Sequence, residues 1–267
     1  MPKLSIITIN LNNSAGLEKT IYSVRNQTYR DFEHIIVDGG STDESLRIID
    51  KYRDGFSYWV SETDTGIYNA MNKGIQMATG DYCFFLNSGD SLFQFDTLNH
   101  VSKSIVNQEI YYCDVMLVYD QNRKIRKTHP ENNLLYYLSY EMICHQGILF
   151  RRDILHKMNL FSEKYKYCSD YEMLIKMILD PMIRFKKINE VLSDYDMQGF
   201  SNHPDSGGKI SLEKAIIWKE YISDSVGEAI SNLTFLNSMQ NSFWYHFRKS
   251  RQIFFQRVFS FVRRKFL

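Results

Sequence analysis

The chain has 267 residues, enough for one large α/β domain or for a core domain of about 200 residues with an appendage. Its hydrophobic fraction of 44% and charged fraction of 24% are ordinary for a globular protein, which argues against a disordered or fibrous chain. With 32 basic and 31 acidic residues, the average charge gives no indication of a nucleic-acid partner, and we expect none.

The first 90 residues alternate between strand-like and helix-like patterns. Short apolar, β-branched runs predict strands, and apolar residues at helical spacing predict helices between them. This alternation indicates βαβ units, a parallel sheet and right-handed crossovers. The last of these strands is apolar throughout, so we expect it to be buried on both faces. The predicted strands are Leu4–Ile9, Phe32–Val37, Phe56–Val60 and Tyr82–Leu86.

Local signals suggest where some helices begin. Ser14 is a candidate cap for the first helix. Ser41 with Glu44, and Ser169 with Glu172, have the spacing of a capping box, in which a hydroxyl and a carboxylate satisfy backbone N–H groups. We therefore expect each of these serines to cap a helix.

Polar loops follow all four strands, and they carry Asn12, Asp38, Asp64 and Asp90. Carboxyl ends of parallel strands lie at one edge of a sheet, where ligands bind. The loop Asn87-Ser88-Gly89-Asp90 could hold a divalent metal and a nucleotide diphosphate there. A plain turn is the alternative, because turns favour these residue types. The glycine-rich fingerprints GxGxxG and GxxxxGK[ST] are absent, so carboxylates and a metal would have to hold the nucleotide.

The remaining chain is less regular. We predict a hairpin of Ile110–Tyr119 and Lys124–His129, strands at Ile148–Arg151 and Ile183–Tyr195, a small-residue lid at 197–208, and helix from 210 onward. We expect a catalytic domain over 1–209 and a helical extension over 210–267.

Four cysteines (Cys83, Cys113, Cys144 and Cys168) lie far apart without a CxxC pair. We expect buried, reduced thiols. The N-terminal apolar run is too short for a signal peptide, and no stretch of about 18 apolar residues is present. We therefore expect a cytoplasmic protein.

Four segments together resemble the family-2 glycosyltransferases, whose nucleotide-sugar-binding fold is called GT-A. The resemblance covers about the first 200 residues, and its third segment is especially similar to bacterial enzymes that build capsular, colanic acid or O-antigen polysaccharides. It implies an α/β, mostly parallel sheet flanked by helices. The segments are SIITINLNN, VDGGSTDES, ETDTGIYNAMNKGI with ATGDYCFFLNSGD, and YCSDYEMLIKM.

The resemblance also implies roles for individual residues. Asp38 matches the carboxylate that contacts the nucleoside base, and Asn12 and Asp64 match positions that line the nucleotide pocket. Asp90 matches the last carboxylate of the metal-binding DxD element. Asp170 matches the catalytic base, although helix dipoles favour an acid at such a position for structural reasons alone.

The chain departs from the family pattern at four positions. Gly39 stands where many relatives have a second acid, and Asn87 and Gly89 replace the first two acids of the metal element. Ser169 replaces the Glu that usually precedes the base. Asp90 is therefore the one carboxylate of its loop. One or two carboxylates can suffice for Mg²⁺ when phosphates and waters complete the shell.

Further candidate contacts to the nucleotide-sugar are Asn87 and Ser88 in the loop, and His145 and Gln146 before a predicted strand. A structural role for His145 is equally plausible from sequence. His203 lies in the predicted lid and is a candidate to close on the diphosphate.

These features predict an inverting glycosyltransferase that moves one sugar from a nucleotide-diphospho-sugar, with a UDP-sugar the leading donor and Mg²⁺ or Mn²⁺ as cofactor. The acceptor would be a polyprenyl-linked or growing surface glycan. The QxxRW motif of processive synthases is absent, which favours single transfer. A non-catalytic sugar-nucleotide-binding or membrane-scaffolding subunit is the alternative. Homo-oligomerisation is left open.

The C-terminal stretch 243–267 suggests contact with a membrane surface. No acid follows Glu228, whereas basic and aromatic residues recur at helical spacing. A basic amphipathic helix of this kind suits an anionic membrane, here the inner face of the cytoplasmic membrane. Packing on the catalytic domain or another subunit is the alternative.

Overall fold

The computed structural model describes residues 3–199, 206–228 and 230. The chain divides into two compact units, 1–218 and 219–267, and every strand of the described residues lies in the first. The predicted lid falls partly, and the stretch 243–267 wholly, outside the described residues. Within the described part, no helix is long and apolar enough to cross a membrane.

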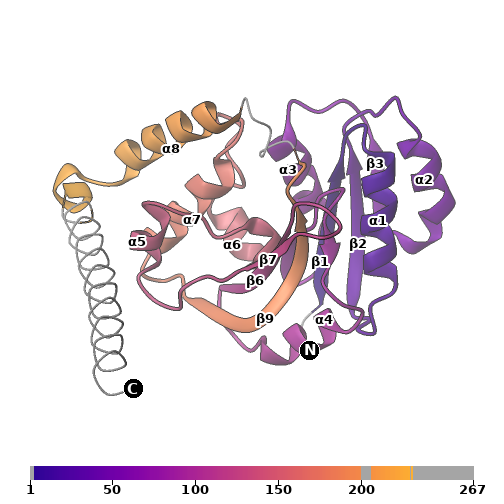
Figure 1. Ribbon diagram of the computed structural model, residues 1–267, viewed down its shortest axis with the longest axis horizontal. Helices are drawn as coiled ribbons and strands as arrows, with labels where there is room; N and C mark the ends of the chain where they lie inside the picture. Colours follow the sequence, from indigo (N-terminus) through magenta and orange to yellow (C-terminus); the bar gives the residue numbers. More distant parts are fainter. Residues whose placement is uncertain (1–2, 200–205, 229, 231–267) are drawn as a thin grey trace, which may run out of the picture. The chain divides into compact units, whose positions relative to one another are not determined.

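The N-terminal half of the sheet is parallel, as predicted (Figure 1). Its strands lie in the order β3-β2-β1-β4, so the chain enters the sheet at β1 and adds strands on both sides of it. The strands are β1 (Leu4–Asn10), β2 (Phe32–Asp38), β3 (Tyr58–Ser61) and β4 (Tyr82–Phe85). The helices between them are α1 (Ser14–Arg25), α2 (Ser45–Tyr52) and α3 (Ile67–Met77), with a 3₁₀ turn η1 (Arg53–Gly55) before β3.

The other half of the sheet is mixed, and it continues in the order β8-β6-β9-β5. β8 pairs antiparallel with β4, β6 antiparallel with β8, and β9 parallel with β6. The predicted hairpin forms between β6 and β7. These strands are β5 (Ser91–Leu92), β6 (Ile110–Val118), β7 (Lys124–Lys127), β8 (Ile148–Arg151) and β9 (Phe185–Asp196). The helices are α4 (Thr97–Ser104), α5 (Leu134–Leu138), η2 (His145–Gly147), α6 (Arg152–Lys157), α7 (Ser169–Leu179) and α8 (Gly207–Tyr221).

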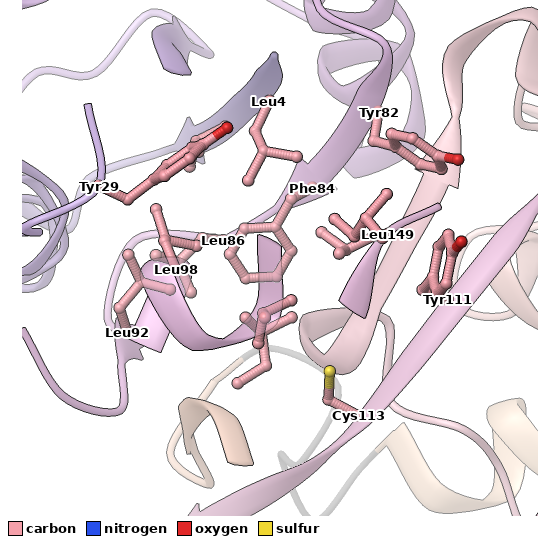
Figure 2. Packing of buried hydrophobic residues seen from close by; sticks show 14 of the residues in the cluster. Leu4, Tyr29, Tyr82, Phe84, Leu86, Leu92, Leu98, Tyr111, Cys113 and Leu149 are labelled. Atoms are coloured by element: carbon pink, nitrogen blue, oxygen red, sulfur yellow. The ribbon is translucent and has the colours of Figure 1, made fainter. Parts of the chain in front are cut away.

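Strand β4 is buried on both faces, which confirms the reading of its apolar run. Figure 2 shows Phe84 in one cluster with Leu4 of β1 and Leu149 of β8. On the opposite face, Phe85 packs edge-to-face against Phe150 and Phe161, with ring centroids 6.0 and 5.3 Å apart. The loop after β4 therefore starts from a fixed point in the core.

The predicted helix caps are wrong in detail. Asn13, and not Ser14, caps α1, since its side chain accepts a hydrogen bond from the N–H of Gly16. Neither predicted capping box forms, because α2 begins at Ser45 without a side-chain cap and Ser169 already lies inside α7. Ser41 is instead drawn into a network around Asp38, described below. For Ser41, these partners outweighed the capping signal, whereas the Ser169 hydroxyl has no hydrogen-bond partner among the described residues.

All four cysteines are buried and free, as expected. Burial raises the pKa of the Cys83 thiol to about 12, so that it packs as a small apolar side chain.

Glu109, directly before β6, ties three strands together. Its carboxylate accepts hydrogen bonds from Arg151 at the end of β8 (2.9 Å) and from Arg184 just before β9 (3.0 Å to Nε). The hydrogen bonds from Arg184 are the main reason why the pKa of Glu109 falls to about 2. Glu109 therefore stays ionised throughout the ordinary pH range.

We predict that Glu109→Gln lowers the free energy of unfolding at pH 7 by about 1–3 kcal/mol, the range for hydrogen bonds to charged groups. The folded pKa lies below the ordinary value of 4.5, so this stabilisation is present above pH 4.5 and is lost as the pH falls towards 2. Urea unfolding at pH 7 and pH 3 should show the gap between variant and wild type narrowing. The exposed Glu190→Gln on β9 is the control, and an equal gap at both pH values would contradict the prediction.

Candidate active site

Asp38, at the end of β2, is a buried carboxylate that joins the ends of three strands. Its Oδ1 accepts from Asn10 Nδ2 on β1 (2.7 Å) and Ser41 Oγ (2.6 Å), and its Oδ2 accepts from Ser61 Oγ on β3 (2.6 Å) and from the Ser41 N–H (2.9 Å). Burial alone would raise the pKa of Asp38, but these hydrogen bonds outweigh it and lower the pKa. Each oxygen already has two donors, so Asp38 organises the sheet edge. Its direct contact with a nucleoside base stays a prediction.

Asn12 and Asp64 lie around the same edge. Asn12 has left-handed backbone geometry (φ 49°), and its Oδ1 accepts from the N–H of Thr42 (2.8 Å), which holds the loop after β2. Asp64 is half-buried, and burial raises its pKa. Its Oδ1 accepts from the N–H of Gly66 (2.9 Å), while its Oδ2 occupies the space into which a Cβ on Gly39 would project. The Asp64 carboxylate, in the loop after β3, thus fills the space beside Gly39, the position at which many relatives carry an acid.

Asp90 is almost completely buried in the loop after β4. Its Oδ1 accepts from the N–H of Asp196 (2.8 Å) and its Oδ2 from Gln146 Nε2 (3.2 Å), while its main-chain oxygen accepts from Thr20 Oγ1 (2.6 Å). Burial raises the pKa of Asp90 to about 6, although the Asp196 N–H bond opposes that rise. No ion pair in the described part of the chain neutralises Asp90. Gln146, predicted as a ligand contact, is thereby placed against this carboxylate.

Asp196 at the end of β9 is a second acid of this site, and the sequence analysis missed it. Its negative charge contributes to the raised pKa of Asp90. Gly89 has φ +104°, and a Cβ there would lie 3.3 Å from Asp196 Oδ2, so this carboxylate covers the position of the missing middle acid. Lys19 Nζ holds the Gly89 carbonyl at 2.6 Å. The signal was present, because β9, like β2, ends in an aspartate.

The two carboxylates fit a hard divalent cation. Within residues 3–199, 206–228 and 230, no cluster of three or more metal-type side chains is present. Mg²⁺, however, commonly takes one or two carboxylates together with substrate phosphates and waters. Asp90 and Asp196 provide that number, and Asp90 brings a buried charge that lacks an ion-pair partner.

Asp170 is the second residue of α7 and is buried, with three polar groups around its carboxylate. Its Oδ1 accepts from the Tyr68 hydroxyl on α3 (2.8 Å) and from the Tyr171 N–H (2.9 Å). Its Oδ2 lies 3.1 Å from His145 Nδ1. Burial, and then the Asp170 charge, raise the pKa of Tyr68 far above its ordinary value, so this hydroxyl remains a donor.

His145 connects Asp170 to the loop after β4. Its Nε2 lies 3.2 Å from Asn87 Nδ2, so a line of contacts runs from Asn87 through His145 to Asp170. Ser88 is held by its backbone, because its carbonyl accepts from Asn13 Nδ2 (3.1 Å). The structure therefore brings Asn87, His145 and Asp170 together, while His203 lies outside the described residues.

Comparisons with known proteins agree with this architecture. Residues 5–159 match glycosyl transferase family 2. A PGL/p-HBAD biosynthesis glycosyltransferase of Mycobacterium bovis (strain BCG / Pasteur 1173P2) is 33% identical over 208 residues, which cover 75% of this chain and 80% of that protein. An uncharacterized glycosyltransferase of Mycobacterium tuberculosis (strain ATCC 25618 / H37Rv) is 30% identical over 209 residues, or 76% of this chain and 78% of that protein.

Solved structures share the fold at lower identity. A fragment of S. aureus TarS in complex with UDP-GlcNAc aligns with a TM-score of 0.64 at 19% identity, over 83% of this chain and 68% of that one. The mannosyltransferase PcManGT from Pyrobaculum calidifontis, in complex with GDP-Man and Mn²⁺, aligns with a TM-score of 0.56 at 17% identity, over 73% and 56%. These likenesses confirm the expected GT-A-like α/β fold. By its sequence match, the chain belongs to glycosyl transferase family 2 and transfers a sugar from a nucleotide sugar.

Proposed function

We propose that this enzyme transfers a single sugar with inversion to an acceptor hydroxyl, and that Asp170 is the general base. The observation that carries the proposal is the hydrogen bonding of Asp170. Two groups contact its Oδ1, whereas among the described residues its Oδ2 has His145 alone and keeps one lone pair for a substrate proton. An inverting reaction needs such a base on the face opposite the leaving group.

The proposed step balances as follows. The acceptor oxygen forms a bond to the anomeric carbon, and its proton passes to Oδ2 of Asp170. The bond between that carbon and the diphosphate oxygen breaks, and its electron pair stays on the diphosphate. Tyr68 and His145 orient the carboxylate and lose no proton.

The donor we propose is a UDP-sugar, held with Mg²⁺ or Mn²⁺ by Asp90 and Asp196. Support comes from the S. aureus TarS complexes with UDP and UDP-GlcNAc, and from the PcManGT complex with Mn²⁺. A bound cation would neutralise charge on the leaving diphosphate. Asn12 and Asp64 line the nucleotide end of the pocket in this proposal, with Asp38 behind them and Ser88 near the diphosphate.

The acceptor we propose is a lipid-linked or growing surface glycan, as in capsular, colanic acid or O-antigen assembly. The Mycobacterium bovis relative is named for PGL/p-HBAD biosynthesis. The basic, aromatic stretch 243–267 is the sequence feature that favours peripheral membrane contact, at the cytoplasmic face. Asn87 and Gly89 in place of acids favour the second candidate, a non-catalytic sugar-nucleotide-binding or scaffolding subunit.

Asp170→Asn is expected to lower kcat at least about 1,000-fold, because an amide cannot take the acceptor proton. A thermal-shift screen of nucleotide sugars with Mn²⁺ would first select the donor. Release of the nucleoside diphosphate then measures turnover, and calorimetry should find donor affinity changed by no more than a few-fold. Asp54→Asn, at an exposed position, is the matched control. Turnover retained in Asp170→Asn would rule out the base assignment, and a wild type that binds donor without turnover would favour the non-catalytic candidate.

Asp90→Asn is expected to raise the melting temperature of the metal-free protein by about 2–4 °C at pH 7.5. The folded pKa of about 6 lies above the ordinary 3.8, so the contribution of Asp90 to stability is present below pH 3.8 and is lost as the pH rises through 6. At pH 5 the folded carboxyl is largely protonated but the unfolded one is still ionised, so the gain should fall by about half, and it should vanish only below pH 3.8. Differential scanning calorimetry at the two pH values measures it.

The same variant should abolish stabilisation by Mn²⁺. In the wild type, the Mn²⁺-induced rise in melting temperature should shrink below pH 6, because protons compete with the metal for Asp90. Asp196→Asn should weaken the rise in part, while Asp194→Asn, two residues away on β9, serves as the control and should leave it intact. An undiminished Mn²⁺ response in Asp90→Asn would exclude this carboxylate as a ligand.

A further inference from the structure

His145 lies between two groups that define where its hydrogen must be. Its side chain is mostly buried on η2, with Nδ1 3.1 Å from Asp170 Oδ2 and Nε2 3.2 Å from Asn87 Nδ2. In the orientation of the Asn87 side chain seen here, Nδ2 faces Nε2 and Oδ1 has no hydrogen-bond partner among the described residues, so the amide donates and Nε2 accepts. The imidazole hydrogen is then on Nδ1, from which it is donated to Asp170. In water, histidine favours the opposite tautomer, so the protein has to impose this one.

The hydrogen-bond donor that contacts Oδ2 determines how the Asp170 carboxylate is oriented. Oδ1 accepts from the Tyr171 N–H and lies 2.8 Å from the Tyr68 hydroxyl, which lies equally close to the Tyr167 carbonyl, so these contacts fix one end of the group. The Nδ1–H of His145 then occupies one lone pair of Oδ2 and leaves the other. One oxygen and one direction therefore remain for an incoming hydroxyl. Without His145, Oδ2 would lose the contact that fixes its rotation about the Cβ–Cγ bond.

We propose that His145 is a positioning residue for Asp170, and that Asn87 acts through it by fixing the Nδ1–H tautomer. The inference rests on the proposed role of Asp170 as base. It assigns His145 to the base, and no longer to the nucleotide-sugar contact predicted from the sequence. His145 keeps its hydrogen during transfer, since the acceptor proton goes to Oδ2 of Asp170.

The proposal accounts for the asparagine that replaces an acid at position 87. A carboxylate there would accept a hydrogen from Nε2, and the imidazole would then either carry two hydrogens or turn its bare Nδ1 towards Asp170. Either outcome changes the donor presented to the base. Asn87 supplies a donor where the relatives' acid would supply an acceptor.

Two substitutions of His145 separate this role from direct contact with the diphosphate. The amide nitrogen of asparagine falls near the position of Nδ1, and that of glutamine near the position of Nε2. We expect His145→Asn to keep kcat within about tenfold of wild type, and His145→Gln and His145→Ala to lose about 100-fold, the scale of a misplaced reactive group. Donor KM should change less than threefold in all three. The proposal fails if His145→Gln keeps near-wild-type kcat, His145→Asn does not, and the KM for the sugar donor rises. That result would mean that His145 contacts the diphosphate.

The tautomer can be measured without turnover. Long-range ¹H–¹⁵N correlation spectra of ¹⁵N-histidine-labelled protein should place the His145 hydrogen on Nδ1, and Asn87→Asp should move it to Nε2 or to both nitrogens. A wild-type hydrogen on Nε2, or an unchanged spectrum in Asn87→Asp, overturns the proposal even if Asp170 is essential. Conversely, an Nδ1–H tautomer in a protein that turns over no nucleotide sugar would overturn the proposed function and leave the tautomer assignment standing. Melting temperatures of all variants confirm folding.

Discussion

The burial of one uncompensated carboxylate, Asp90, is the constraint on which the rest of the site depends. A buried charge without an ion-pair partner costs several kcal/mol unless hydrogen bonds or a metal offset it. The protein supplies two hydrogen bonds, from the Asp196 N–H and Gln146, and anchors the loop backbone through Thr20. The part of the burial cost that these hydrogen bonds do not offset raises the pKa of Asp90 to about 6. Such tension is characteristic of functional sites, where stability is given up for an interaction completed by substrate or metal.

At two positions where the family pattern has an acid, this chain has a glycine with a carboxylate from another part of the chain beside it. Asp64 from β3 covers Gly39, and Asp196 from β9 covers Gly89. In both places a carboxylate oxygen lies where a side chain on the glycine would project, so an acid restored at the glycine would need its neighbour to move. At both glycines a carboxylate from a distant part of the sequence is therefore already in place.

Local patterns predicted the local structure well and the site only in part. The parallel strands follow from short apolar runs, because neighbouring residues alone set that signal. Asp196 escaped notice because its partner Asp90 is 106 residues away, and β9 reaches it only by pairing beside β6. Tyr68 and Asp170 are likewise far apart in the sequence, by 102 residues, and meet only in the folded chain. The cap predicted at Ser41 failed because Ser41 contacts Asp38 and Asn10, partners that no capping rule considers.

The two ends of the site cannot vary independently if His145 orients the base. The loop after β4 carries both Asp90, which contacts Gln146, and Asn87, which contacts the imidazole. Displacing that loop would shift the amide of Asn87 relative to Nε2 and so disturb the donor on Oδ2 of Asp170. The loop is held tightly, by Lys19 on Gly89 and by Asn13 on Ser88, as such a linkage requires. Exchanging the loop for the acid-rich version of a relative would therefore alter the base as well as the metal site, unless position 145 changed with it.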